Sequence, residues 1–261
     1  MHQSKQETIT AIIPCLNEEK QIKRCIHSLS WCNKIQILWM GSDQTAKIAK
    51  SMGAEILEFD KPGQPDFVAV QKNINWAIDN ATTDWLLRVD ADEVVTKKLQ
   101  NEILEMLRNP ANHNFIAFGV PRKQYFLGEF LKGGDWAYDR LTRLFRPKFA
   151  YYKPLVKVHE QLKINGQIGY LKNYLLHYSH PDLKTLNQKF DTYTTLEASD
   201  LDDNYLVALW KIFFLPFYIF LRWLIWHKGY QDGIRGIVVA YFRAKYDFIL
   251  YAKYLTKKRS N

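Results

Sequence analysis

Short apolar runs alternate with amphipathic segments along the first third of the chain. Continuous apolar runs are typical of strands covered on both faces, and they predict strands at residues 8–14, 35–39, 55–59 and 84–89. Between them, apolar positions recur every three or four residues and predict helices at residues 18–29, 41–53 and 66–80. Strands and helices that alternate in this way predict an α/β domain of the kind that binds nucleotides.

The pattern changes after residue 93. A helix is expected at residues 97–108, and shorter, aromatic-rich segments follow it. These segments predict strands at residues 115–120, 123–126, 140–146 and 155–160. Asn165-Gly166 is a hairpin signal inside residues 162–168. The parallel α/β character therefore gives way to a hairpin-like region.

The last part of the chain is a different kind of sequence. Residues 182–204 predict a polar helix, residues 205–226 are rich in Leu, Phe and Trp, and residues 237–255 predict a final helix. Lys211 and Arg222 interrupt the apolar stretch, whereas a membrane-spanning helix needs about 20 nearly uncharged residues. We therefore expect an α/β domain over 1–181 and a helical region over 182–261 that lies on a membrane or makes an oligomer contact. A spanning helix and a helical pair packed on the α/β domain are the alternatives.

Charge indicates the kind of partner. The 36 Lys and Arg exceed the 27 Asp and Glu and give a net charge of +9, which suits nucleotide phosphates or anionic lipid head groups. Nucleic acid is not expected, because the chain shows no zinc-finger spacing, helix-turn-helix signal or RNA-recognition motif. Three cysteines without metal spacing indicate reduced thiols in the core of a cytosolic protein. The N-terminal residues lack the apolar segment of a signal peptide.

Acidic side chains follow the buried strand at residues 84–89. Asp90, Ala91, Asp92 and Glu93 come where open α/β sheets bind ligands, at the carboxyl end of a strand. Two Asp separated by one residue form a hard-ligand site for Mn²⁺ or Mg²⁺, and such ions complete their coordination with water and substrate phosphates. The motif thus points to a metal diphosphate. The alternative is a solvated turn, since Asp-x-Asp is short and frequent.

Other polar residues lie at the same predicted edge of the sheet. Pro14 ends the first strand, and Asn17 is a natural N-cap for the helix that follows it. Asp43 is interpreted as a second N-cap more readily than as a ligand contact, and Lys72 as either a solvated lysine or a phosphate contact. His159, His177 and His180 are interpreted as structural hydrogen-bonding residues, because their spacing fits no zinc site.

An ordered set of motifs resembles the family 2 glycosyltransferases of the GT-A fold, a Rossmann-like mixed sheet. The motifs are Ile12-Ile-Pro-Cys-Leu-Asn-Glu18, Gly41-Ser-Asp-Gln-Thr45, Gln71-Lys-Asn73, Leu87-Arg-Val-Asp-Ala-Asp-Glu93, Val158-His-Glu160 and Leu175-Leu-His-Tyr178. Within that family the set is most similar to the bacterial lipopolysaccharide core β-1,4-glucosyltransferases. The resemblance spans nearly the whole chain.

The resemblance implies an inverting transferase that moves a hexose from a nucleotide-diphosphate sugar, UDP-glucose above all, to a lipid-linked or lipopolysaccharide-core saccharide. It places Asp92 on Mn²⁺ or Mg²⁺ and makes Glu160 the base for the acceptor hydroxyl. The nucleotide sugar would be bound by Pro14, Asn17, Glu18, Trp39, Lys72, Asp90 and Ala91. Such an enzyme would be cytoplasmic and peripheral on the inner face of an anionic cell membrane, with a possible homo-oligomer contact through its C-terminal helices.

One position departs from the family pattern. Members usually carry an Asp directly after the second strand, where this chain has Leu38 and Trp39. The site could stack the base on Trp39, prefer another nucleotide, or have lost donor binding, so a silent nucleotide-sugar-binding scaffold is the alternative function. A sugar nucleotidyltransferase is disfavoured, because residues 14–19 lack the Gly-rich phosphate loop.

The acceptor side is expected in a loop rich in glycine and aromatic residues. Asp135 and Trp136 are the candidates there, in a segment that reads as a lid. Asp135 and Asp139 are also the alternatives to Glu160 as the base.

Overall fold

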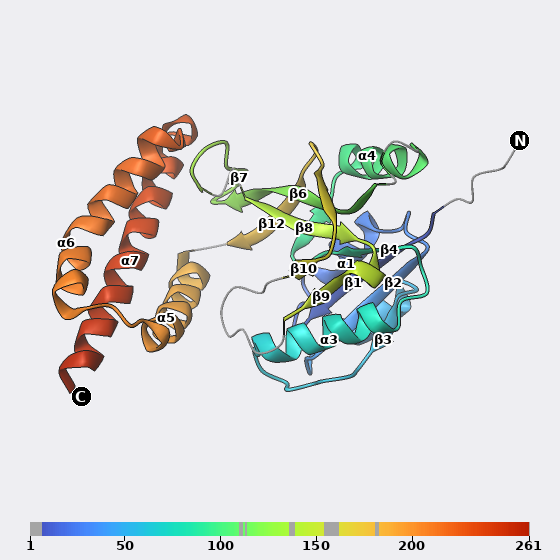
Figure 1. Ribbon diagram of the computed structural model, residues 1–261, viewed down its shortest axis with the longest axis horizontal. Coiled ribbons are helices and arrows are strands. Elements are labelled where there is room, and N and C mark those ends of the chain that lie inside the picture. Colours follow the sequence, from blue (N-terminus) through green and yellow to red (C-terminus); the bar gives the residue numbers. More distant parts are fainter. Residues whose placement is uncertain are drawn as a thin grey trace, which may run out of the picture. The chain divides into compact units, whose positions relative to one another are not determined.

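The computed structural model describes residues 7–109, 112, 114–135, 139–153, 162–180 and 183–260 (Figure 1). The chain divides into two compact units. The first contains residues 1–122 and 140–177, and the second contains residues 123–139 and 178–261. The expected boundary at 181 lies close to the start of the second unit's long segment, but the sequence did not indicate that residues 123–139 belong with it.

Parallel strands form one half of the sheet in the first unit. β1 (Ile9–Cys15) pairs with β2 (Lys34–Trp39) on one side and β4 (Trp85–Arg88) on the other, and β2 pairs with β3 (Glu55–Leu57). The connections contain α1 (Ile22–Ser28), α2 (Thr45–Ser51) and α3 (Phe67–Asp79). These elements confirm the strands and helices expected from the hydrophobic pattern.

Antiparallel strands extend this sheet, which runs in the order β3-β2-β1-β4-β8-β6-β12-β5. The added strands are β5 (Glu93–Val95), β6 (Phe115–Phe126), β8 (Arg140–Phe145) and β12 (Leu175–His180), and α4 (Lys97–Arg108) follows β5. The two strands expected between residues 115 and 126 form one strand, because the chain stays extended through Pro121, which lies opposite Arg140. The sheet is therefore mixed.

The hairpin expected at Asn165-Gly166 is wrong. β10 (Leu162–Ile164) pairs antiparallel with β9 (Ala150–Tyr152), whereas β11 (Gln167–Tyr170) pairs parallel with β6. Gly166 has a φ of 144°, and a Cβ there would lie 2.5 Å from the Ile116 side chain. The turn signal was real, but the two flanking strands find partners elsewhere in the sequence. The strand expected at 155–160 lies outside the described residues.

The cysteines belong to the core of the first unit. Cys15 and Cys25 are buried beside the apolar side of α1 and the sheet, and all three cysteines are free thiols. Burial raises the pKa of the Cys32 thiol to about 12. These groups are un-ionised and unreactive at neutral pH, in agreement with their interpretation as core residues.

Helices form most of the second unit. They are α5 (Leu183–Asp200), α6 (Tyr205–Leu221) and α7 (Ile234–Ser260). A π-helical turn, Arg222–Trp226, continues α6, and a 3-10 turn, Gly229–Asp232, precedes α7. The end of β6 and β7 (Glu129–Phe130) form a small hairpin in the same unit. The final helix is longer at both ends than the sequence predicted.

The loop after β7 is hydrogen-bonded to the connection between α6 and α7. The carboxylate of Asp232 accepts hydrogen bonds from the backbone N–H groups of Lys132 and Gly133 at 2.8 and 2.9 Å. Gly134 donates its N–H to the carbonyl of His227 at 2.7 Å. A side chain at residue 134 would overlap Trp223, and Gly134 has a φ of 81°, so glycine is required there. This loop is therefore part of the helical unit's framework.

Candidate active site

The acidic residues of the site come directly after β4. This strand is fully buried between β1 and β8, and Val89 continues its burial. Asp90 then begins a tight turn in which the N–H of Glu93 donates to the carbonyl of Asp90 at 2.9 Å. The buried strand thus delivers three carboxylates within four residues to the carboxyl edge of the parallel sheet, as its sequence predicted.

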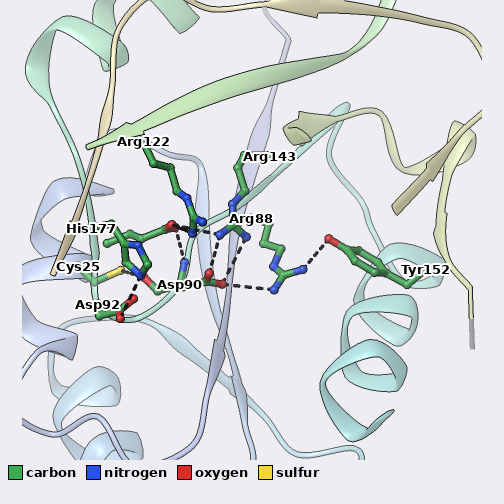
Figure 2. A network of polar contacts seen from close by, with 9 residues as sticks. Cys25, Arg88, Asp90, Asp92, Arg122, Arg143, Tyr152 and His177 are labelled. Atoms are coloured by element: carbon green, nitrogen blue, oxygen red, sulfur yellow. Dashed lines mark hydrogen bonds and ion pairs between the residues drawn. The ribbon is translucent and has the colours of Figure 1, made fainter. Parts of the chain in front are cut away.

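Asp90 is held by arginine. Its carboxylate accepts from Arg143 at 2.5 Å and from Arg88 at 3.4 Å (Figure 2). Burial alone would raise the pKa of Asp90, but the two guanidinium groups, Arg143 first, hold it well below its usual range. Arg88 also donates to the hydroxyl of Tyr152 at 2.6 Å, which connects the site to β9. Asp90 is therefore an ionised carboxylate with fixed partners inside the protein.

Glu93 is the structural anchor of the acidic turn. Its side chain is completely buried and accepts from Arg143 and from Arg122, each at 3.1 Å. Its other oxygen accepts the backbone N–H of Asp90 at 2.9 Å. Because buried charges require partners, the three arginines balance the two carboxylates and fix the shape of the turn.

We expect Arg143→Met to destabilise the protein by about 3–5 kcal/mol, the cost of removing one partner from a buried ion pair. Urea unfolding measures the loss, with Arg140→Met, an exposed position on the same strand, as the control. Because the pKa of Asp90 is lowered by folding, its contribution is complete above the unfolded pKa and is lost as the pH falls. The difference between variant and wild type should therefore shrink below about pH 4. Equal stability of the two proteins at pH 7 would contradict this account.

Asp92 faces a histidine. Its Oδ2 lies 3.3 Å from Nε2 of His177, which β12 brings beside β5 through the pairing of His177 with Glu93. Both side chains are mostly buried, and Nδ1 of His177 has no hydrogen-bond partner among the described residues. A carboxylate and an imidazole that converge in this way can share one divalent cation.

The residues present fit a divalent cation of the Mn²⁺ or Mg²⁺ kind. Such ions commonly take only one or two protein ligands and fill the other positions with water and substrate phosphates. No group of three His, Cys, Asp or Glu side chains converges within the ranges that the structure describes, so a closed protein cage is not the arrangement found there. Asp92 and His177 are the pair that would hold the ion, while arginine binds Asp90 and Glu93.

Asn17 and Asp43 link two loops at the same edge of the sheet. The Oδ1 of Asn17 accepts the N–H groups of Ser42 and Asp43 at 2.9 and 3.2 Å. Asp43 accepts the N–H of Glu19 at 3.2 Å and that of Thr45 at 2.9 Å. The expected N-cap role of Asn17 is wrong, because α1 begins later, at Ile22, with Gln21 in the cap position. Asn17 instead joins the two loops at this edge of the sheet, where it remains a predicted nucleoside contact.

The remaining nucleotide candidates lie on this edge or near it. Pro14 is opposite Leu38 in the parallel pairing of β1 with β2, and Glu18 donates its N–H to the Thr45 hydroxyl at 2.9 Å. Ala91 is buried inside the acidic turn. Pro14 thus lies in β1, Glu18 in the loop that follows β1, and Ala91 in the turn after β4. Their contact with the nucleotide sugar stays a prediction.

Trp39 ends β2, where the family usually has an Asp. The Nζ of Lys61 lies 3.5 Å from the centroid of a Trp39 ring, a cation–π contact. The indole Nε1 is buried and has no hydrogen-bond partner in the described part of the chain. A base that stacks on this side of Trp39 would have to displace Lys61.

Lys72 lies on the exposed side of α3. Its Nζ pairs with Asp60 at 3.0 Å, and more than half of the side chain is exposed. Surface pairs of this kind contribute little to stability, about 0–1 kcal/mol, so the pair can open at small cost. Its expected contact with the diphosphate stays a prediction.

The acceptor-side candidates belong to the second unit. The carboxylate of Asp135 forms an ion pair with Arg222, directly after α6, and lies in close contact with Nδ1 of His227. Its part in acceptor binding or base catalysis stays a prediction. An acceptor would have to compete with these contacts for the carboxylate. Trp136 and Glu160 lie outside the described residues.

The sequence interpretation missed two residues that define the site. Arg143 was not singled out, because an arginine in an aromatic strand has no motif of its own. His177 was interpreted as structural, although it belongs to the Leu175-Leu-His-Tyr178 motif that carried the resemblance. The position of that motif in an ordered set was the signal that could have identified His177.

The mixed α/β sheet, with an Asp-x-Asp turn at the carboxyl edge of its parallel half, has the arrangement of the GT-A fold. The profile of Glycosyl transferase family 2 matches residues 10–176, and the chain belongs to this family. It is an enzyme of the glycosyltransferase type.

Among curated proteins, the chain is similar to the lipopolysaccharide core biosynthesis glycosyltransferase LpsC of Rhizobium meliloti (strain 1021), with 29% identity over 97% of this chain and 95% of LpsC. It is 25% identical to the uncharacterized glycosyltransferase RT0209 of Rickettsia typhi, over 90% of this chain and 84% of the relative.

Two solved structures are similar in fold. TarS of S. aureus matches with a TM-score of 0.48 and 14% identity over 76% of this chain and 40% of TarS. Glucosyl-3-phosphoglycerate synthase of Mycobacterium tuberculosis, in complex with Mn²⁺ and UDP-glucose, matches with a TM-score of 0.36 and 20% identity over 46% of this chain and 44% of the synthase.

Proposed function

We propose that this family 2 enzyme is an inverting, metal-dependent hexosyltransferase that takes glucose from UDP-glucose. The acceptor would be a saccharide of the lipopolysaccharide core or another lipid-linked glycan. The observation that carries the proposal is the convergence of Asp92 and His177 at the carboxyl edge of the sheet, beside two arginine-bound carboxylates. The similarity to LpsC supports the acceptor class, and the resemblance of the ordered motifs to the glucosyltransferases of the family supports UDP-glucose as the donor.

In this proposal each acid has a separate task. Asp92 and His177 would hold the cation, which, when bound, neutralises charge on the diphosphate. Asp90 stays ionised through Arg143 and Arg88 and, with 30% of its side chain exposed, would contact the ribose. Glu93 holds the acidic turn in place through ion pairs with Arg122 and Arg143 and a hydrogen bond from the Asp90 N–H.

Glu160 remains the proposed general base. Inversion requires a carboxylate on the side of the sugar opposite the leaving diphosphate, to accept the proton of the attacking acceptor hydroxyl. Asp90, Asp92 and Glu93 share one turn and are committed to arginines and to the cation side. The resemblance assigns the opposite side to Glu160, and Asp135 is the next candidate.

A lipid-linked acceptor implies work at a membrane surface. We propose that the protein is cytoplasmic and peripheral on the inner face of the cell membrane, with its C-terminal helices as the contact. Support comes from the similarity to LpsC and from the basic, aromatic sequence after residue 205. Association of two copies through these helices is the competing use of the same region.

A binding-only relative is the second candidate, favoured by one observation. The usual Asp after β2 is replaced by Trp39, and Lys61 covers its ring. A transfer assay with radiolabelled UDP-glucose, Mn²⁺ and rough lipopolysaccharide separates the two candidates. We expect labelled lipid in the presence of Mn²⁺ and none in excess EDTA, with UDP-galactose and GDP-mannose as donor controls. Absence of transfer and of donor hydrolysis under all metals would favour the binding-only protein.

A further inference from the structure

An apolar stripe runs along the solvent side of α6. Leu206, Trp210, Phe213 and Phe217 follow one another at steps of four, three and four residues, so they share one side of the helix. Each is between 58% and 73% exposed. Soluble monomers rarely expose contiguous large apolar side chains on this scale, and such patches mark interaction surfaces.

The stripe continues beyond the helix. The residues concerned are all more than half exposed: Ile225 and Trp226 in the π-helical turn, Tyr230 in the 3-10 turn, and Ile234 at the start of α7. α6 packs along α7 (Figure 1), and Ala208, on the side of α6 opposite the stripe, is buried. The exposed aromatic residues are therefore the side of α6 that the helical unit leaves uncovered.

The two cations that interrupt this apolar sequence are turned toward acids of the same unit. Lys211 donates to Asp203 at 2.8 Å, and this hydrogen bond raises the pKa of the lysine. Arg222 pairs with Asp135. Lys211 is the one charged residue between Tyr205 and Leu221 in the sequence, so the outward stripe itself carries no charge. In the sequence these cations interrupt the apolar stretch, but in the structure they do not lie on the stripe.

The segment of the sequence that contains the stripe is basic. Residues 205–261 contain ten Lys and Arg but only two Asp and Glu, a net charge of +8 where the whole chain carries +9. An uncharged aromatic stripe within a strongly basic segment is complementary to a bilayer that contains anionic lipids. A second copy of the same segment would instead bring like charges together.

We propose that the outward side of α6 is a membrane anchor, inserted parallel to the plane of an anionic bilayer through Leu206, Trp210, Phe213 and Phe217. This deepens the proposed function, on which it rests for the lipid-linked acceptor. By length and composition alone, residues 205–226 could also cross a membrane, with a mean hydropathy of 1.6. Crossing is disfavoured because α6 packs along α7, whose Arg243, Lys245 and Lys253 would enter the hydrocarbon with it.

Vesicle flotation of the full-length protein tests the anchor. The vesicles are phosphatidylcholine with about a third phosphatidylglycerol, and the variant is Trp210→Ser/Phe213→Ser/Phe217→Ser. In the wild type these three large apolar side chains leave water together when the protein binds. Their loss should lower the vesicle partition coefficient of the variant at least about 100-fold relative to the wild type. The matched control, Phe149→Ser/Tyr170→Ser, removes two exposed aromatics of the first unit and should bind as the wild type does. Wild-type binding by the triple variant would overturn the proposal.

A second measurement reports the depth of insertion. Trp210 fluorescence, taken as the difference between wild type and Trp210→Phe, should be quenched by lipids brominated near the head group more than by lipids brominated at the chain end. Stronger quenching at the chain end, with resistance to carbonate extraction, would show a spanning helix and overturn the in-plane arrangement. A dimer that dissociates in the triple variant, without vesicle binding by the wild type, would assign the stripe to a second copy.

The outcome is independent of the proposed chemistry. The triple variant should still hydrolyse UDP-glucose slowly in solution at the wild-type rate, because its substitutions lie on α6 alone. Flotation without any hydrolysis by the wild type would count against the proposed function and leave the anchor standing. Hydrolysis without flotation would count against the anchor and leave the proposed function standing.

Discussion

Asp92→Asn should lower the rate of sugar transfer by at least about 1,000-fold, because the cation that neutralises a diphosphate contributes several kcal/mol. The carboxamide keeps the shape of Asp92 and its place beside His177 but removes the charge that attracts a divalent ion. Initial rates at increasing Mn²⁺ concentration measure the effect. We expect the variant to remain slow at every Mn²⁺ concentration at which the wild type is active.

The matched control is Asp79→Asn, an exposed aspartate at the end of α3. It removes the same charge from the same unit and should leave the rate within about twofold, as surface substitutions usually do. If Asp92→Asn transferred sugar at the wild-type rate, or if the wild type kept full activity in excess EDTA, Asp92 would not be a metal ligand. His177→Ala should share the metal-dependent defect if the pair acts together.

Glu160→Gln should lower turnover by about 100-fold to 10,000-fold, the usual contribution of a general base. The amide cannot accept the proton that the acceptor hydroxyl loses as it attacks the sugar. Donor affinity should change little, because the base acts on the acceptor. Single-turnover transfer and a separate donor titration distinguish these two quantities.

Asp135→Asn and Asp139→Asn are the informative comparisons, since they are the alternative bases. The ion pair of Asp135 with Arg222 and its close contact with His227 predict that its substitution disturbs the stability of the helical unit as well as any acceptor contact. Transfer by Glu160→Gln at close to the normal rate would remove Glu160 from the mechanism and direct attention to Asp135.

Local patterns predicted most of the first unit. The strands β1 and β4 could be predicted from their apolar runs, because strands covered on both faces must be continuously hydrophobic. The helix at residues 66–80 was predicted from its recurring apolar positions, and the structure adds that Asp66 caps it by accepting from the N–H groups of Val68 and Ala69. The acidic turn follows from the position of β4 in the sheet. These features depend on neighbours in the sequence.

The rest depends on partners far along the chain. Arg143 meets Asp90 across 53 residues, and no local pattern states that an arginine of β8 will face the end of β4. Asn17 has the sequence context of an N-cap, but its oxygen is taken by backbone N–H groups 25 and 26 residues away. The turn signal at Asn165-Gly166 predicts a change of direction but does not specify which strands will pair. Tertiary contacts decided each of these cases.

The same limit applies to the C-terminal helices. Lys211 and Arg222 were counted against a membrane-spanning helix, but the sequence does not show which way their side chains point. In the structure both cations pair with acids of the helical unit, so the outward side of α6 keeps its apolar character. The sequence therefore showed the composition of this helix but not which of its sides is exposed.

Calorimetric titration of UDP-glucose into the wild-type protein, with and without Mn²⁺, tests the central claim most directly. The account predicts saturable binding with one donor per chain when Mn²⁺ is present, and loss of that binding in excess EDTA and in Asp92→Asn. Binding of equal strength without any divalent ion, or no binding of UDP-glucose under either condition, would contradict it.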